Sequence, residues 1–313
     1  MKKIILLIPV IILYISGCSP YPDLQKIEFD ELNYPFTVKN IQLNESLNLA
    51  YVDEGKGEQT IIFIHGLGSY LPAWKNNVEV LKNNYRCIAI DLPGYGKSSK
   101  AIHEGTMDFY ADVVKNLMDK LQIKSAVIAG HSMGGQIAIV MSLKYPDYVS
   151  KLILVDPAGF ETFNEGQKEW FRSVMTVTGV KNTNAQQIRA NLTGNFYNLP
   201  DDAEFMITDR IAMRGAKEFD NYCHAVVRSV KGMVDQPVYD FLPDIKQETL
   251  IMFGENDNLI PNPYLNGGLT EDIANIGKER IPNSKLVIVP NCGHFMQFEK
   301  PDEFNKAVLD FLK

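Results

Sequence analysis

One serine lies in a glycine-rich turn, the string GHSMGG at residues 130–135. The turn follows the apolar run 126–129 and precedes the apolar, helix-spaced stretch 136–141. A tight bend from strand into helix strains the residue at its apex, and its neighbours must lack a Cβ where chain segments approach closely. Such a bend would hold the hydroxyl of Ser132 clear of the strand, beside the N–H groups that begin the helix. The pattern predicts Ser132 as a nucleophile.

A serine hydroxyl becomes a good nucleophile only when a base removes its proton, and that base is a histidine oriented by a carboxylate. His294 follows the last predicted buried strand, in the string NCGHF at residues 291–295, where a loop can bring it to the carboxyl edge of a sheet. It is therefore the predicted base. The other four histidines lie in less suitable surroundings: His65 in a glycine-rich loop, His103 in a polar loop, His131 beside the serine and His224 in a helical segment.

The acid that orients this histidine should come from the loop after the preceding strand. The string GENDNLIP at residues 254–261 supplies Asp257 there, with Glu255 as its nearest rival. Asp156 is another candidate, because it follows the apolar run 152–155 and would also lie at the carboxyl end of a strand. The pattern favours Asp257 and leaves both alternatives open.

Strands and helices alternate along most of the chain, which predicts an α/β fold with right-handed crossovers and a mostly parallel twisted sheet flanked by helices. The run 60–64 is apolar without alternation, as expected for a strand covered on both faces. The predicted strands are 36–43, 47–52, 60–64, 86–90, 125–129, 151–155, 249–253 and 285–289, and the predicted helices are 73–82, 106–121, 133–143, 270–277 and 301–312.

The alternation fails between residues 158 and 242, where four segments are helical in pattern and buried-strand runs are absent. We therefore expect a helical cap at 158–242, inserted into a core formed by 36–157 and 243–313, and lying over the carboxyl edge of the sheet. The predicted cap helices are 167–177, 184–191, 203–216 and 221–230. Seven apolar cap residues could line an acyl pocket, although packing is their commoner role: Phe163, Trp170, Phe171, Met175, Phe205, Met206 and Met213.

The N-terminal residues have the pattern of a secretion signal. A basic start at 1–3 precedes the apolar run 4–15, which is too short to span a bilayer. The string ISGC at 15–18 resembles the lipobox of bacterial lipoproteins, which implies a signal peptide at 1–17, lipidation of Cys18 and a linker at 18–35. A plain secretory signal or an uncleaved anchor is the alternative. The resemblance implies a protein attached to a membrane of the bacterial cell envelope, and Ser19 favours the outer membrane.

Composition and charge exclude several classes of function. The chain has 313 residues, 45% of them hydrophobic, and a formal charge of −7, which suits a globular protein and argues against nucleic-acid binding. The glycine patterns at 66–68 and 94–98 lack glycines that nucleotide-binding loops require, so no cofactor is expected. No metal is expected either, since no histidines have zinc-site spacing. After lipidation three cysteines would remain, so a complete disulfide framework is impossible, whereas a Cys223–Cys292 bond stays open.

Five motifs in order resemble those of the α/β-hydrolase family. They are HGLG at 65–68, DLPGYGKS at 91–98, GHSMGG at 130–135, GEND at 254–257, and GH at 293–294 followed by EKP at 299–301. Ser132, Asp257 and His294 occur in the family's Ser, Asp, His order. The resemblance implies that the backbone N–H groups of Leu67 and Met133 form the oxyanion hole. It also implies that His65 braces the oxyanion loop and that His131 packs beneath the turn.

The resemblance implies a serine hydrolase that cleaves carboxylic esters through an acyl-enzyme, and the envelope location favours lipophilic esters with short to medium acyl chains. The same triad also serves carbon–carbon bond hydrolases and perhydrolases, and the fold has non-catalytic ligand-binding members, so these stay alternatives. Epoxide hydrolases and haloalkane dehalogenases are disfavoured, because their nucleophile is an aspartate. The sequence predicts a small-molecule substrate and makes no prediction of oligomeric state.

Overall fold

The computed structural model describes residues 21 and 24–313. The predicted signal peptide at 1–17 and the predicted lipidation site Cys18 lie outside the described residues, and both stay predictions. Within the described part, no helix combines the length and the apolarity needed to cross a membrane.

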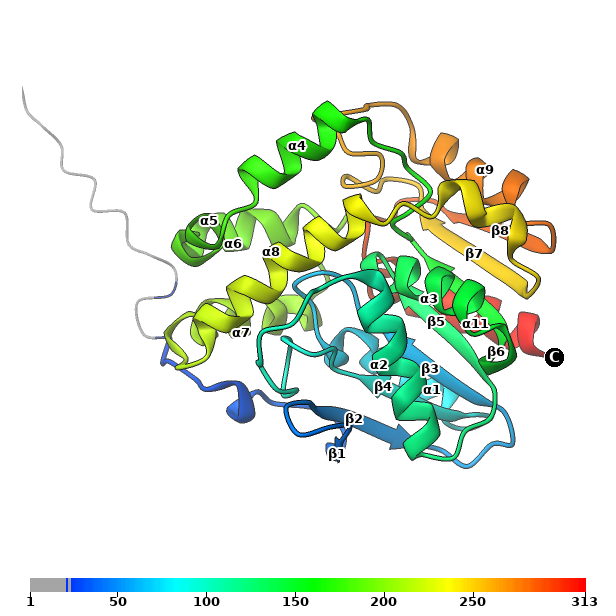
Figure 1. Cartoon of the computed structure of the whole chain (residues 1–313), viewed down its shortest axis with the longest axis horizontal. Coiled ribbons are helices and arrows are strands. Elements are labelled where there is room, and N and C mark those ends of the chain that lie inside the picture. Colours follow the sequence, from blue (N-terminus) through cyan, green and yellow to red (C-terminus); the bar gives the residue numbers. More distant parts are fainter. Residues whose placement is uncertain (1–20, 22–23) are drawn as a thin grey trace, which may run out of the picture.

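The described residues form an eight-stranded sheet in the order β1-β2-β4-β3-β5-β6-β7-β8 (Figure 1). β1 pairs with β2 and β2 with β4 in antiparallel fashion, and every later pairing is parallel. The predicted α/β class with a mostly parallel sheet is confirmed. The strands are β1 Lys39–Gln42, β2 Asn48–Glu54, β3 Thr60–Ile64, β4 Arg86–Ile90, β5 Ala126–His131, β6 Val149–Val155, β7 Glu248–Gly254 and β8 Ser284–Val289.

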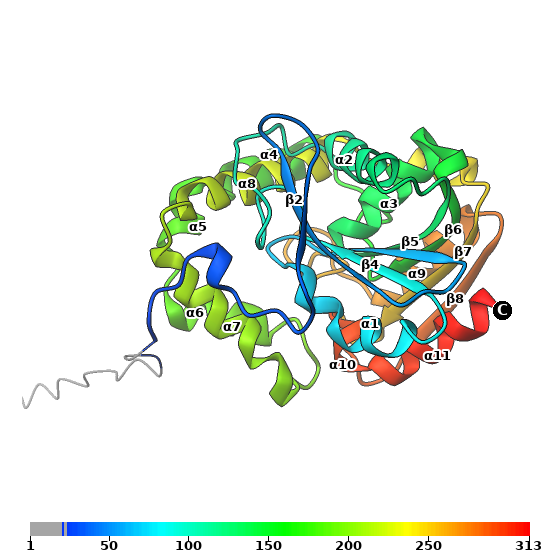
Figure 2. The same cartoon turned by 90° about the horizontal axis from the view of Figure 1, so that it is seen from below.

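Helices cover both faces of the sheet, and this explains why the central strands are apolar without alternation. In β3, Ile62 and Ile64 pack in the cluster that includes α2, α3 and α9, whereas Ile61 and Phe63 pack in the cluster that includes α1, α10 and α11. Figure 2 shows α2 and α3 on one side of the sheet and α1, α10 and α11 on the other. The bounds are α1 Lys75–Leu81, α2 Met107–Lys120, α3 Met133–Lys144, α9 Thr270–Arg280, α10 Met296–Glu299 and α11 Pro301–Leu312.

The segment between β6 and β7 is helical in the structure. It forms the part of the molecule that lies beyond the ends of the strands in Figure 1. Its longest helix, α8, packs against α4 and α5 of the same segment and against α2 of the core. The bounds are α4 Glu165–Val174, α5 Val177–Asn182, α6 Ala185–Thr193, α7 Glu204–Ala212 and α8 Phe219–Asp235.

One cap helix and one core helix were missed by the sequence patterns. The helix predicted at 167–177 ends at Val174, because Thr176 starts a new helix, α5, by accepting a hydrogen bond from the N–H of Gly179. The other missed helix, α10, is a single turn of four residues. Cys87, Cys223 and Cys292 are all buried free thiols, so the structure does not contain the Cys223–Cys292 bond that the sequence left open.

Candidate active site

Ser132 occupies the turn between β5 and α3 and has a strained backbone. Its φ is 54° and its ψ is −118°, a left-handed region that costs a non-glycine residue free energy. Glycines at 130 and 134 let backbone segments lie closer to the turn than any side chain would allow. A Cβ on Gly130 would lie 2.1 Å from the carbonyl oxygen of Gly134, and a Cβ on Gly134 would lie 2.3 Å from the carbonyl oxygen of Ile64. The expected bend is therefore present. It requires glycine at 130 and 134 because a larger residue would clash with the backbone.

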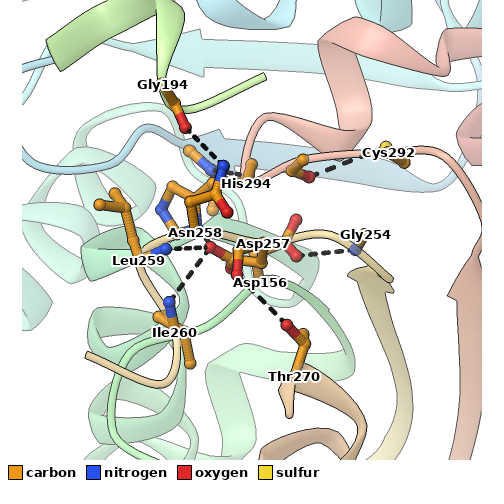
Figure 3. A network of polar contacts seen from close by, with 12 residues as sticks. Asp156, Gly194, Gly254, Asp257, Asn258, Leu259, Ile260, Thr270, Cys292 and His294 are labelled. Carbon is orange, nitrogen blue, oxygen red and sulfur yellow. Dashed lines mark hydrogen bonds and ion pairs between the residues drawn. The ribbon is translucent and has the colours of Figure 1, made fainter. Parts of the chain in front are cut away.

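His294 and Asp257 come from the loops after β8 and β7 and form a buried pair. The Nδ1 of His294 lies 2.7 Å from the Oδ2 of Asp257, while Oδ1 accepts hydrogen bonds from the N–H groups of Leu259 at 2.7 Å and Ile260 at 3.1 Å (Figure 3). With Nδ1–H donating to Asp257, the Nε2 of His294 is the nitrogen that can accept a proton. His294 and Ser132 line the same cavity.

Asp156, the first alternative acid, lies close to this pair but has a different environment. It follows β6 with a φ of 42°, is fully buried, and accepts a hydrogen bond of 2.9 Å from the N–H of Gly254. Burial, together with the charge of Asp257, raises the pKa of Asp156 well above its usual range. Burial thus disfavours the charged form of Asp156, and its hydrogen bond to Gly254 joins the ends of β6 and β7.

Glu255, the second alternative, has an exposed side chain. The structure thus pairs the candidate base with Asp257. Asp156, Asp257 and His294 each present one atom within 4.8 Å of the others, a spacing that a metal ion could also use. The hydrogen bond between Asp257 and His294 already engages two of these atoms, and it accounts for their proximity without an ion.

The two predicted oxyanion donors lie beside the serine. Met133 is the first residue of α3, so its N–H has no acceptor within the helix. Among the described residues, no backbone or side-chain acceptor pairs with the N–H of Leu67. The loop that carries Leu67 abuts the nucleophile, because a Cβ on Gly66 would lie 3.0 Å from the Cβ of Ser132. Both N–H groups can therefore serve an oxyanion at this position.

His65 and His131 are buried and hydrogen-bonded to the backbone. The Nδ1–H of His65 donates to the carbonyl oxygen of Gly66 at 2.8 Å, while its Nε2 accepts from the N–H of Leu92 at 3.0 Å. His131 donates through Nε2 to the carbonyl oxygen of His294 at 2.8 Å. Burial lowers the pKa of His65 to about 4 and lowers the pKa of His131 well below its usual range. Both rings are thus neutral at pH 7 and hold the loops around the site.

The neutral His65 leads to a prediction about acid stability. The unfolded chain binds a proton at His65 below pH 6.5, but the folded chain binds it only below about 4, so folded stability falls as the pH drops through this window. We expect His65 to contribute a loss of roughly 2 to 3 kcal/mol between pH 7 and pH 4.5. Urea denaturation of wild type and His65→Gln at both pH values measures it. The variant should be less stable at pH 7 and lose less on acidification; equal losses in the two proteins would contradict the assignment.

Glu299 connects the candidate base to the cap. Its carboxylate accepts hydrogen bonds from the N–H of Gly293 at 2.8 Å and from the N–H groups of Tyr197 at 3.0 Å and Asn198 at 2.6 Å. The loop of His294 is thereby fixed to the segment after α6. The sequence contained a signal for this residue, because Glu299 belongs to the EKP string of the family resemblance, but its role as a connector was not predicted.

A cavity of about 680 Å³ lies between the cap and the carboxyl edge of the sheet, with Ser132 and His294 in its wall. Most of its lining is apolar. Packing was the favoured role for the seven apolar cap residues, yet five of them line the cavity: Phe163, Phe171, Met175, Met206 and Met213. The other two have the packing role: Trp170 packs against Phe171 and Tyr264, and Phe205 packs against Tyr70 and Phe298.

Arg210, which no sequence pattern singled out, also lines this cavity. It belongs to α7, and its guanidinium carbon lies 4.2 Å from the centre of the Tyr222 ring. Its Nη1 is buried and has no hydrogen-bond partner among the described residues. Burial lowers the pKa of Arg210 to about 10, so the group is still charged at neutral pH. A positive charge without a hydrogen-bonded acidic partner among the described residues therefore lies in the wall of a mostly apolar cavity, which Lys168 and Glu161 also line.

Two features are typical of α/β-class hydrolases. One is the strand order with its two antiparallel pairings at one edge, and the other is a strained serine directly after β5. Residues 59–301 match the alpha/beta hydrolase fold family. The chain belongs to this family.

Two bacterial relatives are similar over most of their length. The 2-hydroxy-6-oxononadienedioate/2-hydroxy-6-oxononatrienedioate hydrolase 1 of Pseudomonas putida is 32% identical over 276 residues, which cover 85% of this chain and 92% of the relative. The corresponding hydrolase of Escherichia coli K12 is 30% identical over 286 residues, which cover 87% of this chain and 93% of the relative. These relatives are hydrolases, in agreement with the fold.

Solved structures agree on the architecture. A probable hydrolytic enzyme from Pseudomonas aeruginosa superposes with a TM-score of 0.81 at 25% identity, covering 93% of this chain and 99% of that one. A thermophilic esterase from Thermogutta terrifontis superposes with a TM-score of 0.70 at 26% identity, covering 88% of this chain and 98% of that one. Esterases and hydrolases named for dienedioates thus both occur among the similar proteins.

Proposed function

We propose that this hydrolase cleaves carboxylic esters with lipophilic acyl groups, and that Ser132, His294 and Asp257 are its catalytic triad. The observation that carries the proposal is the buried hydrogen bond of 2.7 Å between His294 and Asp257, in a cavity that His294 shares with the strained Ser132. A ligand-binding protein needs neither a nucleophile nor an oriented base, so this arrangement favours catalysis over binding alone.

The reaction proceeds in two halves. The Nε2 of His294 takes the proton of Ser132 while Oγ attacks the ester carbonyl, and the N–H groups of Leu67 and Met133 stabilise the oxyanion. The imidazolium, steadied by Asp257, then protonates the departing alcohol and leaves an acyl group on Ser132. In the second half His294 takes a proton from water, the hydroxide attacks the acyl carbonyl, and the acid is released as Ser132 recovers its proton.

The lining of the cavity supports a lipophilic acyl group. Its volume of about 680 Å³ falls within the range of small-molecule sites, and its walls are formed mostly by aliphatic, aromatic and methionine side chains from the cap. Each methylene that enters such a site contributes about 0.8 kcal/mol. The cavity should therefore prefer butyryl and longer acyl groups over acetyl groups.

Arg210 favours a second candidate function, the hydrolysis of a carbon–carbon bond in a substrate that carries a carboxylate. An unpaired, charged guanidinium in a cavity suits a carboxylate, which it can bind in a bidentate manner. The relatives from Pseudomonas putida and Escherichia coli are named for dienedioates, which carry two carboxylates. The same serine, base and acid would serve this chemistry.

Two substrate series separate the two functions. For p-nitrophenyl esters we expect kcat/KM to rise about tenfold from acetate to butyrate, because two more methylenes enter the cavity. A dienedioate of the kind named for the relatives should be cleaved more slowly than these esters. Preference for acetate would remove the support for a lipophilic acyl group.

Faster cleavage of the dienedioate would replace the ester proposal by the second candidate, and Arg210→Met then provides the control. In that case the variant should lower kcat/KM for the dienedioate by about ten- to a hundredfold, the typical cost of losing a charged hydrogen bond, and should lower it less for uncharged esters.

A further inference from the structure

Large apolar side chains are exposed around two neighbouring segments of the surface. Ten such side chains are exposed among the described residues, and five of them belong to α4 or to the loop 259–269 between β7 and α9. We call these five residues the apolar rim: Trp170, Val174, Leu259, Tyr264 and Leu269. Tyr264 is 83% exposed and Leu269 is 67% exposed. Half of the exposed large apolar side chains thus lie on two segments, which is unusual for a surface without a binding partner.

The two segments of the apolar rim are joined. The side-chain amide of Gln167 donates to the carbonyl oxygen of Leu265 at 3.0 Å and to the Oδ1 of Asn266 at 2.7 Å. The rings of Trp170 and Tyr264 lie 6.4 Å apart. In Figure 1 the orange loop before α9 passes the end of α4 where these contacts form. The two segments that carry the apolar rim therefore adjoin each other, with Trp170 and Tyr264 in contact between them.

The apolar rim borders the cavity that contains Ser132. Val174 and Leu259 line the cavity, yet each is 44% exposed, so these two side chains belong both to the cavity wall and to the outer surface. Trp170, Tyr264 and Leu269 lie outside the cavity lining. Val174 and Leu259 therefore give an apolar molecule at this surface an apolar edge to the cavity wall, beside the polar side chains of Lys168 and Asn262.

The charges beside the apolar rim neutralise one another. On α4, Lys168 pairs with Glu165 at 2.7 Å and Arg172 pairs with Glu169 at 3.3 Å. The whole chain carries a formal charge of −7. The negative net charge of the protein would repel an anionic surface. The partner that fits is therefore uncharged or zwitterionic, and it binds the apolar rim through the hydrophobic effect.

The N-terminal chain reaches the described fold on the cap side of the molecule. Tyr21, the first described residue, donates through its hydroxyl to Glu204 of α7 at 3.1 Å. The chain therefore enters the described fold at the cap, which also contains α4, and not at the opposite end of the sheet. A lipid attached at the predicted site Cys18 would draw the cap towards the bilayer.

We propose that the apolar rim docks on the surface of an uncharged or zwitterionic lipid layer, from which ester molecules pass through the cavity mouth to Ser132. This inference rests on the proposed ester hydrolysis and adds the physical state of the substrate: an ester held in a lipid layer or droplet, not one dissolved in water. Binding comes from burial of the apolar rim and should be insensitive to salt.

Tryptophan fluorescence tests the docked orientation in the full-length protein. The sequence contains two tryptophans, and Trp74 is fully buried, so Trp170 reports on contact with lipid. On phosphatidylcholine vesicles with brominated acyl chains, the emission of Trp170 should be quenched and shifted to shorter wavelength. An unquenched Trp170 in protein that co-sediments with the vesicles would overturn the proposal.

The matched control moves the tryptophan to another exposed apolar position. Phe241 is 54% exposed and lines a separate surface groove that none of the candidate catalytic residues borders. The variant Trp170→Phe/Phe241→Trp should show no quenching by the same vesicles. Equal quenching at both positions would mean that the protein is attached without a preferred face, and would also overturn the proposal.

Kinetics test the consequence for catalysis. The variant Tyr264→Ser/Leu269→Ser removes two exposed side chains outside the cavity, and serine at 269 suits the residue that precedes α9. We expect hydrolysis of dissolved p-nitrophenyl butyrate to change less than about twofold, and hydrolysis of emulsified tributyrin to fall by about tenfold or more. The control Ile102→Ser/Phe241→Ser, at two similarly exposed positions, should lose neither activity.

The outcomes separate this inference from the proposed function. If the wild type cleaves neither ester, the proposal of ester hydrolysis is wrong. If the wild type cleaves both and the Tyr264→Ser/Leu269→Ser variant keeps its activity on the emulsion, only the docking inference is wrong. If that variant instead converts a dimer into a monomer in sedimentation experiments, a second copy of the chain covers the apolar rim, and the lipid proposal is overturned.

Discussion

Ser132→Ala should lower turnover of p-nitrophenyl butyrate by about 10⁴- to 10⁶-fold and leave the fold intact. The hydroxyl of Ser132 is the atom that attacks the carbonyl, and among the described residues its Oγ has no structural hydrogen bond that the variant would remove. Alanine also keeps the strained backbone, whose φ is 54°. The residual rate would come from substrate binding and from the N–H groups of Leu67 and Met133.

A matched serine in the same helix provides the control. Ser142 is buried near the end of α3 and donates to the carbonyl oxygen of Ile139, far along the helix from the turn. Ser142→Ala should keep nearly all activity. A fluorophosphonate should label the wild type and Ser142→Ala, but not Ser132→Ala. Label on folded Ser132→Ala, or turnover near the wild-type rate, would remove the serine from the mechanism.

Asp257→Asn should lower turnover by about 10⁴-fold. The equivalent change in the Ser-His-Asp triad of a protease has an effect of this size. The Oδ1 of asparagine can still accept the hydrogen bonds from Leu259 and Ile260, so the loop should keep its shape. Its amide group would then face the Nδ1 of His294 and donate to it. The imidazole would have its proton on Nε2, the nitrogen that must accept the proton of Ser132.

Asp156→Asn is the matched control, because it makes the same change in the neighbouring carboxyl group. The pKa of Asp156 is raised by burial and by the charge of Asp257, which favours the neutral side chain, and asparagine can still accept from the N–H of Gly254. We expect less than about a tenfold loss of turnover. A larger loss in Asp156→Asn than in Asp257→Asn would assign the acid to Asp156.

Much of the core could be predicted from local patterns. The run 60–64 is apolar at every position, and β3 has these bounds because helices cover both of its faces. The bend at Ser132 could be predicted for a similar reason, since only glycine fits beside the close backbone contacts at 130 and 134. The contact between Gly130 and Gly134 lies within a few residues, so a local pattern carries it, whereas the contact of Gly134 with Ile64 forms only in the folded chain.

The choice among the candidate acids needed the fold. Asp156, Asp257 and Glu255 all follow strands, so their positions in the sequence are nearly equivalent. The structure separates them by distance and solvation: Asp257 lies 2.7 Å from His294, Asp156 is held at the N–H of Gly254, and Glu255 faces solvent. These differences arise from the packing of distant strands, which no local pattern contains.

The lining of the cavity was also decided by tertiary packing. An arginine on a short amphipathic helix is most simply expected at the surface, yet Arg210 lines the cavity, because α7 packs on α6 and is held to the core through the hydrogen bond from Tyr70 to Asp209. Trp170 has the helical spacing of a pocket residue but packs outside it. Local patterns thus supplied the strands, the strained turn and the order of the candidate triad, since these depend on backbone sterics and strand burial. Three features depend on contacts between segments that are distant in the sequence, and only the folded chain forms them. They are the pairing of Asp257 with His294, the position of Arg210 in the cavity and the exposed apolar rim.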